Sequence, residues 1–263
     1  MSIYDNNIIL AYCTVVAFIF GACMGSFLNC TAIRIGKGEA FVKGRSHCVS
    51  CGHDLCWKDL IPILSWVTLG GKCRYCGAKI SARYPLTEII CGALTVACLL
   101  KFDLTVLCAR NYIFLIMMFL LTLTDVDTMT IPDSCHVIMT LAWAVTAPVL
   151  YSLPEIGIHV AAALVFGGGV LVLSLVMDHV MHRDTLGGGD IKLLAVVGLY
   201  FGFVGTLFVL ILSCVLGLAF NMYLMKKSNN KKEFPFGPWI AAASAVILFV
   251  GEPLINWYSG LIG

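Results

Sequence analysis

Long apolar stretches separated by shorter polar segments form the dominant pattern of this 263-residue chain. A helix needs about 20 largely apolar residues to cross a lipid bilayer. Stretches that meet or approach this length are Ile8–Ile33, Tyr84–Leu100, Asn111–Thr124, His136–Leu153, Ile156–Val180 and Gly237–Trp257. The pattern predicts one membrane-spanning helix over each of them.

The stretch Ile191–Met225 is too long for a single crossing. At about 1.5 Å per residue, one helix over this stretch would reach roughly 52 Å, whereas the hydrocarbon layer is only about 30 Å thick. The segment Gly202–Gly205 offers a turn within it. We therefore predict two short crossings here, which brings the expected number of spans to eight.

Composition agrees with a membrane location and excludes several other classes of protein. Hydrophobic residues make up 60% of the chain and charged residues 12%, far from the balance of a soluble domain. So much apolar surface also excludes a disordered chain. A net charge of only +2 argues against a nucleic-acid-binding protein. The expected fold class is an all-α polytopic membrane protein with about eight transmembrane helices and a small cytoplasmic zinc-binding loop.

The distribution of basic residues predicts the orientation in the membrane. Lys and Arg are enriched in cytoplasmic loops. With the N-terminus outside and eight spans, 15 of the 17 basic residues lie in loops that face the cytoplasm. These loops are Arg34–Arg83, Asp125–Cys135, His182–Lys192 and Lys226–Glu233. The segment Met1–Asn7 has no Lys or Arg, so the first span is not expected to be a cleavable signal peptide.

The polar loop Arg34–Arg83 contains two Cys-x-x-Cys pairs, Cys48 with Cys51 and Cys73 with Cys76. Two such pairs are typical of a tetrahedral zinc site with four thiolate ligands. Four thiolates leave no open coordination position, so a structural role is favoured over chemistry at the metal. The expected division of the chain is a first helix over residues 1–33, this loop over 34–83, and a seven-helix membrane domain over 84–263.

Acidic residues at the predicted membrane boundary are the strongest candidates for catalysis. Asp125 ends a short span, and Asp190 follows the glycines 187–189 at the start of another. The predicted topology places both on the cytoplasmic side. Two adjacent carboxylates that share one proton can act together as general base and general acid. Glycines would let the backbone turn sharply and a substrate strand approach. An N-cap role is the alternative for Asp190.

Other polar residues near these acids have less specific interpretations. Asp127 and Asp133 are expected to be interfacial acids, with Asp133 capping the helix that follows Pro132. Lys192 is expected either to contact a lipid phosphate or to orient the aspartates. His136 is interpreted as an interfacial or packing residue, because it shows no ligand spacing with other histidines.

A Gly-x-Gly-Asp motif combined with an earlier Asp is similar to the intramembrane aspartyl proteases. Further motifs resemble the bacterial type IV prepilin peptidases in particular, and they occur in the same order along the chain. These motifs are Gly25–Asn29 followed by Arg34, the paired Cys-x-x-Cys, Ile61–Trp66, Arg83–Glu88, Asp125–Asp133, Gly187–Lys192 and Pro235–Pro238.

The resemblance implies an inner-membrane enzyme that removes the short basic leader from prepilins and pseudopilins on the cytoplasmic side. It places Asp125 and Asp190 on the family's two catalytic aspartates. It also implies a second activity, the N-methylation of the new terminal residue with S-adenosylmethionine, linked to the N-terminal region and its tetracysteine loop. The residues that would bind this methyl donor stay unassigned.

Two other functions are compatible with the residues alone. The two membrane aspartates suit an ion- or proton-coupled transporter, although no repeat symmetry typical of such proteins is evident. Alternatively, the chain could be a scaffold subunit of a pilus assembly platform that uses the zinc loop for docking. Lipid contacts are expected at the lysine run, and the oligomeric state is not predicted.

Overall fold

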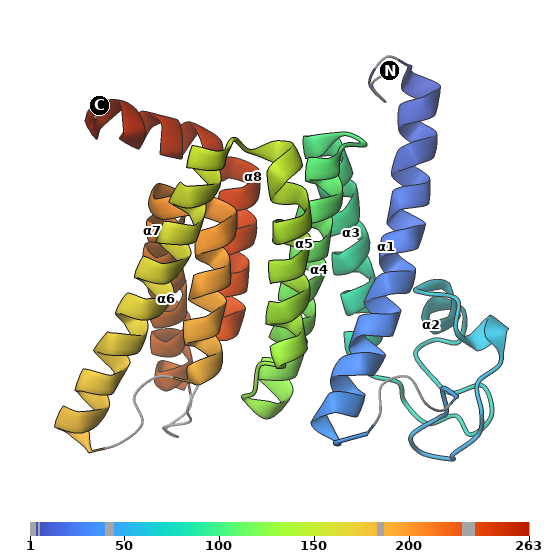
Figure 1. The fold of residues 1–263 in the computed structure, drawn as a ribbon. Coiled ribbons are helices and arrows are strands. Elements are labelled where there is room, and N and C mark those ends of the chain that lie inside the picture. Colours follow the sequence, from blue (N-terminus) through green and yellow to red (C-terminus); the bar gives the residue numbers. More distant parts are fainter. Residues whose placement is uncertain (1–3, 5, 40–44, 183–186, 228–234, 263) are drawn as a thin grey trace. The chain divides into compact units, whose positions relative to one another are not determined.

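The computed structural model describes residue 4 and residues 6–39, 45–182, 187–227 and 235–262. Arg183 and most of the Lys226–Glu233 run lie outside them. The elements are α1 (Asn7–Gly36), η2 (Trp57–Asp59), α2 (Leu64–Thr68), α3 (Arg83–Phe102), α4 (Val106–Thr128), α5 (Asp133–Leu150), α6 (Leu153–Met181), α7 (Gly188–Lys227) and α8 (Gly237–Ile262) (Figure 1). No strand occurs among the described residues. The predicted all-α fold class is confirmed.

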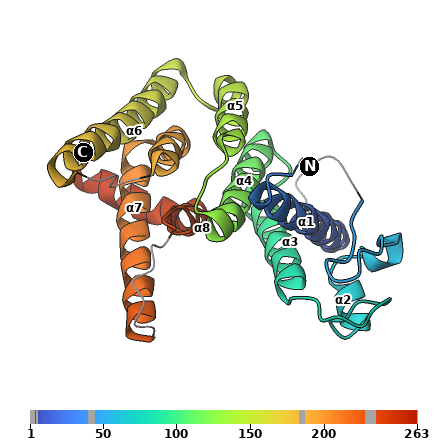
Figure 2. The same ribbon diagram turned by 90° about the horizontal axis from the view of Figure 1, so that it is seen from below.

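Seven helices in the described part of the chain are long and apolar enough to cross a membrane, against eight predicted spans. The difference arises at α7, which forms one element over the two crossings predicted between residues 191 and 225. Its backbone leaves the helical region at Gly202, with φ 63° and ψ −165°. The Thr206 hydroxyl donates to the Val197 carbonyl, nine residues earlier, so the chain folds back there. The two halves of α7 run in different directions (Figure 2), as the predicted turn requires.

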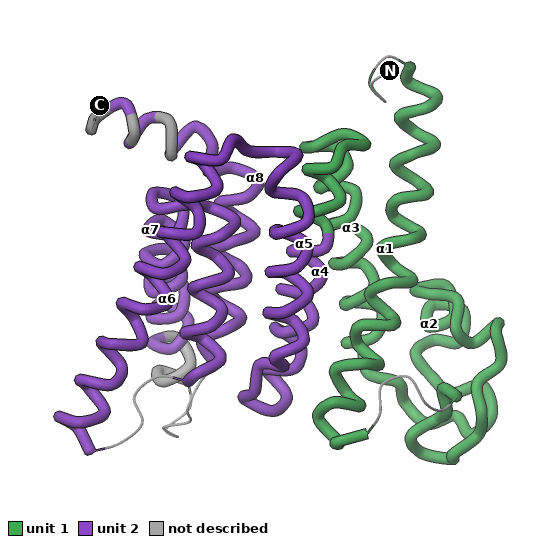
Figure 3. Tube along the Cα trace, viewed as in Figure 1, with its two compact units in different colours: residues 1–112 green, residues 113–263 purple. Residues whose placement is uncertain are grey.

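The chain divides into two compact units, residues 1–112 and 113–263 (Figure 3). In the first unit α1 packs closely against α3. A Cβ atom on Gly21 would lie 2.8 Å from the Cys91 carbonyl oxygen, and one on Gly25 would lie 2.7 Å from that of Thr87. Glycine is therefore required at both positions for the two helices to approach this closely.

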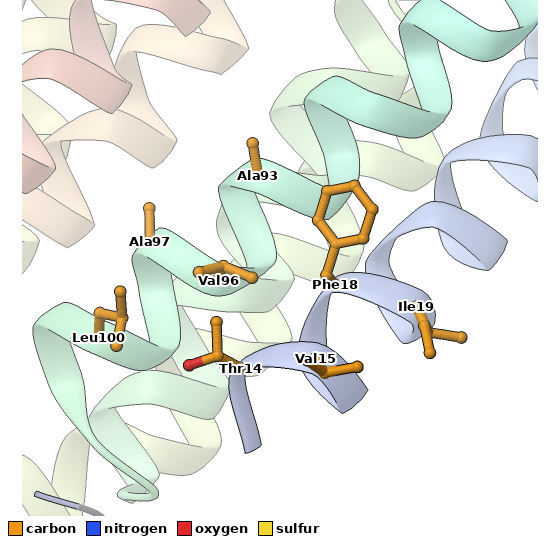
Figure 4. Close-up of a pocket in the computed structure, with 8 residues that line it drawn as sticks. All are labelled: Thr14, Val15, Phe18, Ile19, Ala93, Val96, Ala97 and Leu100. Atoms are coloured by element: carbon orange, nitrogen blue, oxygen red, sulfur yellow. The ribbon is translucent and has the colours of Figure 1, made fainter. Parts of the chain in front are cut away.

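An apolar groove lies between α1 and α3, with Phe18 and Ala97 among the side chains on its two walls (Figure 4). The one hydroxyl in its lining, that of Thr14, donates to the Leu10 carbonyl of its own helix. The groove thus presents no polar group that could take part in chemistry.

The second unit contains most of α4 and all of α5–α8. Helices α6 and α7 meet through small residues, because a Cβ on Gly198 would lie 2.6 Å from the Ala163 Cα. The Tyr200 hydroxyl donates to the Met139 carbonyl at 2.9 Å and thereby links α7 to α5. The Phe114 ring of α4 stacks on Tyr200. These contacts hold α4, α5, α6 and α7 together within the unit that contains the acidic residues.

Candidate functional site

Asp125 lies in the last turn of α4 and is only 5% exposed. The helix ends shortly after it, where Met129 takes a left-handed conformation with φ 54°. The carboxylate accepts a hydrogen bond of 3.1 Å from the backbone N–H of Gly237, the first residue of α8. A residue 112 positions away therefore fixes the orientation of the Asp125 side chain.

Asp190 lies in the first turn of α7, directly after the glycine run. Its backbone N–H donates to the Gly187 carbonyl at 3.0 Å, which forms the turn into the helix. One carboxylate oxygen, Oδ1, is buried and has no hydrogen-bond partner within the described part of the chain. This oxygen is therefore available to a water molecule or a substrate.

The Ile131 side chain lies between the segments that carry the two aspartates. A Cβ atom on Gly189 would lie 3.0 Å from the Ile131 Cβ, and one on Gly237 would lie 3.2 Å from the Ile131 Cδ1. Ile131 thus packs between the glycine run that precedes Asp190 and the glycine that holds Asp125.

Asp133 and Lys192 form an ion pair beside the aspartates, with 2.7 Å between Nζ and Oδ1. The prediction that Asp133 caps α5 is wrong, since Pro132 occupies the cap position and the Asp133 carboxylate turns to Lys192 instead. This ion pair differs from both roles expected for Lys192, a contact with a lipid phosphate or the orientation of Asp125 and Asp190, and neither of those is tested. His136 is buried, with Nδ1 3.9 Å from Asp133 Oδ1, whereas Asp127 is exposed.

The four cysteines of the loop come together as a candidate metal centre. The Sγ atoms of Cys48, Cys51, Cys73 and Cys76 all lie within 4.8 Å of one another. A tetrahedral zinc ion with Zn–S bonds of about 2.3 Å requires sulfurs about 3.8 Å apart, and Cys48 and Cys76 are separated by 3.9 Å. The donor set fits a closed, four-thiolate site.

Both halves of the metal centre have the same backbone geometry. The backbone carbonyl of Cys48 accepts a hydrogen bond of 2.8 Å from the Gly52 N–H. The backbone carbonyl of Cys73 accepts one of 2.9 Å from the Gly77 N–H. Both glycines have φ near 70°, which a residue with a side chain rarely adopts. Hydrogen bonds from the backbone amides of Cys51 and Ser50 lower the pKa of Cys48 to about 6. This favours the thiolate that a metal ion binds.

Asp59 connects the two halves of the loop. Its carboxylate accepts from Arg74 Nε at 2.7 Å and from the Tyr75 hydroxyl at 3.0 Å. Burial opposes its ionisation, but hydrogen bonds from Arg74, Cys56 and Tyr75 hold the pKa of Asp59 well below its usual range. Cys56 is therefore occupied by this network and lies outside the metal centre, as its position outside the Cys-x-x-Cys pattern indicates.

Comparisons with known proteins cover most of the chain. Residues 19–102 match the bacterial peptidase A24 N-terminal domain, and residues 112–222 match the type IV leader peptidase family. A prepilin leader peptidase/N-methyltransferase from Aeromonas hydrophila is 33% identical, with 92% of each chain covered. One from Myxococcus xanthus is 33% identical over 85% of this chain and 68% of its own. The relative of that name from Bacillus subtilis is 29% identical, covering 92% and 96%.

The chain belongs to the type IV leader peptidase family. No solved structure matches it significantly. The two family segments, residues 19–102 and 112–222, fall on the two compact units of the structure. In this leader peptidase the aspartates lie in the second unit and the cysteine cluster in the first.

Sequence reasoning missed two residues that shape the aspartate site of this leader peptidase. Gly237 belongs to the Pro235–Pro238 motif, which carried the resemblance but had no assigned role. Ile131 is an ordinary apolar residue between the predicted acids, and no sequence signal distinguishes it. The glycine that follows each Cys-x-x-Cys pair, at 52 and 77, was a visible signal for the tight turns of the metal loop.

Proposed function

We propose that this chain removes the leader peptide from type IV prepilins or pseudopilins, with Asp125 and Asp190 activating the water that attacks the peptide bond. The observation that supports the proposal is that the segments carrying these two aspartates meet at Ile131, which packs against Gly189 and Gly237. The relatives from Myxococcus xanthus and Aeromonas hydrophila are named as prepilin leader peptidases. Family membership favours this function over the transporter and scaffold alternatives.

The geometry supports catalysis by a carboxylate pair. An ionised carboxylate accepts a proton from water, and the resulting nucleophile attacks the scissile carbonyl carbon while the partner acid protonates the carbonyl oxygen. Collapse of the tetrahedral intermediate then expels the amine, which takes a proton from the same pair. The Gly237 N–H holds the Asp125 carboxylate through a hydrogen bond. Oδ1 of Asp190 has no hydrogen-bond partner among the described residues. We assign the two chemical roles to the pair as a unit.

We also propose that Cys48, Cys51, Cys73 and Cys76 bind Zn²⁺ and that the chain N-methylates the new terminal residue with S-adenosylmethionine. The compact four-sulfur cluster supports the first proposal, and the names of the relatives support the second. In this proposal the zinc ion stabilises the fold of the loop and takes no part in catalysis. Cys73 is the one buried apolar side chain in the described part of the loop. Metal binding therefore supplies much of the folding free energy of the loop.

The long apolar helices indicate a multi-pass membrane protein. We propose that it resides in the bacterial inner membrane with its N-terminus outside and its aspartates facing the cytoplasm. The placement of 15 of the 17 basic residues in predicted cytoplasmic loops supports this orientation.

The test is cleavage of a purified prepilin by the full chain in lipid nanodiscs, followed by mass spectrometry. Asp125→Asn and Asp190→Asn are each expected to lower the cleavage rate by at least about 1,000-fold, because a single catalytic group carries effects of this size. Asp127→Asn, an exposed acid two residues from Asp125, serves as the matched control and should cleave at close to the wild-type rate. Undiminished cleavage by either dyad variant would refute the mechanism.

A further inference from the structure

Cys98 and Cys108 form a close pair of sulfur side chains that is separate from the metal centre. Cys98 lies near the end of α3 and Cys108 near the start of α4, ten positions apart in the chain. Their Sγ atoms are 3.8 Å apart, so the two sulfurs are in contact. Cys98 is buried, whereas Cys108 is half-buried. Neither residue belongs to the aspartate site, so the proposed peptidase mechanism leaves this pair without a role.

The contact between Cys98 and Cys108 involves their backbones as well as their sulfur atoms. The Cys98 thiol donates to the Cys108 carbonyl, and the Cys108 thiol donates to the Cys98 carbonyl, both at 3.6 Å. Each side chain therefore points toward the backbone of the other residue. A disulfide bond of about 2.05 Å requires the sulfurs to approach by a further 1.8 Å or about that, and rotation about the Cα–Cβ bond moves a cysteine sulfur. The pair is thus arranged for a disulfide bond.

A tight turn holds the two helix ends together. Asp103 follows α3 in a left-handed conformation with φ 54°, and its N–H donates to the Leu99 carbonyl at 2.9 Å. The Thr105 hydroxyl accepts from the Cys108 N–H at 3.1 Å, as an N-cap residue does at the start of a helix. The end of α3 and the beginning of α4 are both fixed by these hydrogen bonds, so the cysteines face each other across a short, ordered turn.

The proposed orientation places this turn on the outer side of the membrane. Helix α3 begins at Arg83, at the end of the loop that contains the metal centre, and crosses from the cytoplasm to the outside. The compartment outside a bacterial inner membrane is oxidising, so disulfides form and persist there. The cytoplasm is reducing, which keeps the four thiols of the metal centre available for a metal ion. The two groups of cysteines therefore meet opposite redox conditions.

We propose that Cys98 and Cys108 form a disulfide bond that joins α3 to α4 at the outer face of the membrane, an inference that rests on the proposed orientation. The oxidant is a disulfide-bearing thiol oxidase of that compartment. The Cys108 thiolate attacks the oxidase disulfide, forms a mixed disulfide and expels one oxidase thiolate. The Cys98 thiolate then attacks the Cys108 sulfur and expels the second. The pair loses two electrons and two protons, and the oxidase disulfide takes up both to become a dithiol.

This bond would prevent the two helix ends from separating. A disulfide restricts the unfolded chain, so the oxidised protein should resist unfolding better than the reduced one. Reduction is expected to lower the unfolding temperature of the full chain in nanodiscs by about 5 °C. The double variant Cys98→Ala/Cys108→Ala lacks both thiols, and its unfolding temperature should not respond to the same reductant. Equal responses of the wild type and the double variant would show that the pair carries no stabilising bond.

The decisive experiment traps the thiols in intact cells that express the full chain. The cells are quenched with acid, and the denatured protein is alkylated with N-ethylmaleimide, then reduced and alkylated with a heavier maleimide. Mass spectrometry is expected to find the heavier label on Cys98 and Cys108 in most molecules. Cys91, which is also buried on α3, is the internal control and should carry the first label. Heavier label on both members of the pair, with Cys91 in its reduced form, supports the disulfide.

A second variant distinguishes failure of the disulfide from failure of the orientation. Leu104 is 72% exposed in the turn, and Leu104→Cys in the double variant should react with a membrane-impermeant maleimide added to spheroplasts. If Cys98 and Cys108 carry the first label while Leu104→Cys reacts from outside, the disulfide proposal is wrong and the orientation stands. If the pair carries the first label and Leu104→Cys does not react, the orientation fails and this inference falls with it.

Discussion

A single backbone N–H holds the Asp125 carboxylate in position. It comes from Gly237, where a Cβ atom would lie 2.6 Å from Asp125 Oδ2. The obstructing atom is the end of a side chain rather than backbone, so the protein can relieve the clash by rotating the carboxylate away. Such a rotation costs little stability but moves a reacting group, which makes Gly237 a position where fold and activity separate.

Gly237→Ala is therefore expected to lower leader removal by about 100-fold, the cost of displacing a catalytic group by roughly 1 Å. The unfolding temperature should change by only a few degrees. Gly168→Ala, at a helical glycine with open space around it, is the matched control and should cleave normally. Full activity of Gly237→Ala would show that the contact with Gly237 does not position Asp125.

At this scale the sequence identified residues whose chemistry is rare in a membrane protein. Asp125, Asp190 and the paired cysteines stand out because acids and Cys-x-x-Cys pairs are uncommon in apolar chains. It could not identify Gly237, whose importance arises from a contact across 112 positions. The capping role expected for Asp133 failed because a lysine 59 residues away competes for the same carboxylate.

At the scale of elements, α6 and α7 depend on small residues where they touch. A Cβ on Gly198 would lie 2.6 Å from the Ala163 Cα and 2.7 Å from its nitrogen. These are backbone atoms, so the clash can be relieved only if the helices move apart. Sequence hydropathy predicted both helices and the turn at Gly202 inside α7, because bilayer thickness limits the length of a crossing. The contact partner of Gly198 was not predictable from a small-residue pattern alone.

We expect Gly198→Ala to destabilise the protein by about 1–3 kcal/mol through overpacking at this contact. Gly168→Ala on α6 should instead be neutral or stabilising by up to about 1 kcal/mol, because alanine favours a helix and nothing lies near its Cβ. Thermal unfolding in one detergent measures both variants. If the two alanines shift the unfolding temperature equally, close packing at Gly198 contributes nothing specific.

For the whole molecule, the residues of the proposed peptidase site and of the proposed metal centre fall in different compact units. The aspartates and Gly237 belong to the unit of residues 113–263, whereas the cysteine cluster belongs to residues 1–112. Leader removal and methyl transfer should therefore respond differently to changes confined to one unit.

Removal of the proposed zinc ion should affect methyl transfer and leave leader removal intact. With Cys73 as the one buried apolar side chain in the described part of the loop, the loop should open when the proposed zinc ion is removed. Treatment with a zinc chelator is expected to leave the rate of leader removal within about twofold of the untreated enzyme, since the dyad contains no metal ligand. The mature pilin should lack the methyl group, so its mass falls by one methylene. Cys76→Ser should reproduce this result, and Cys56→Ser, whose hydroxyl keeps the bond to Asp59, should not. Loss of cleavage with methylation intact would mean that the loop serves the peptidase instead.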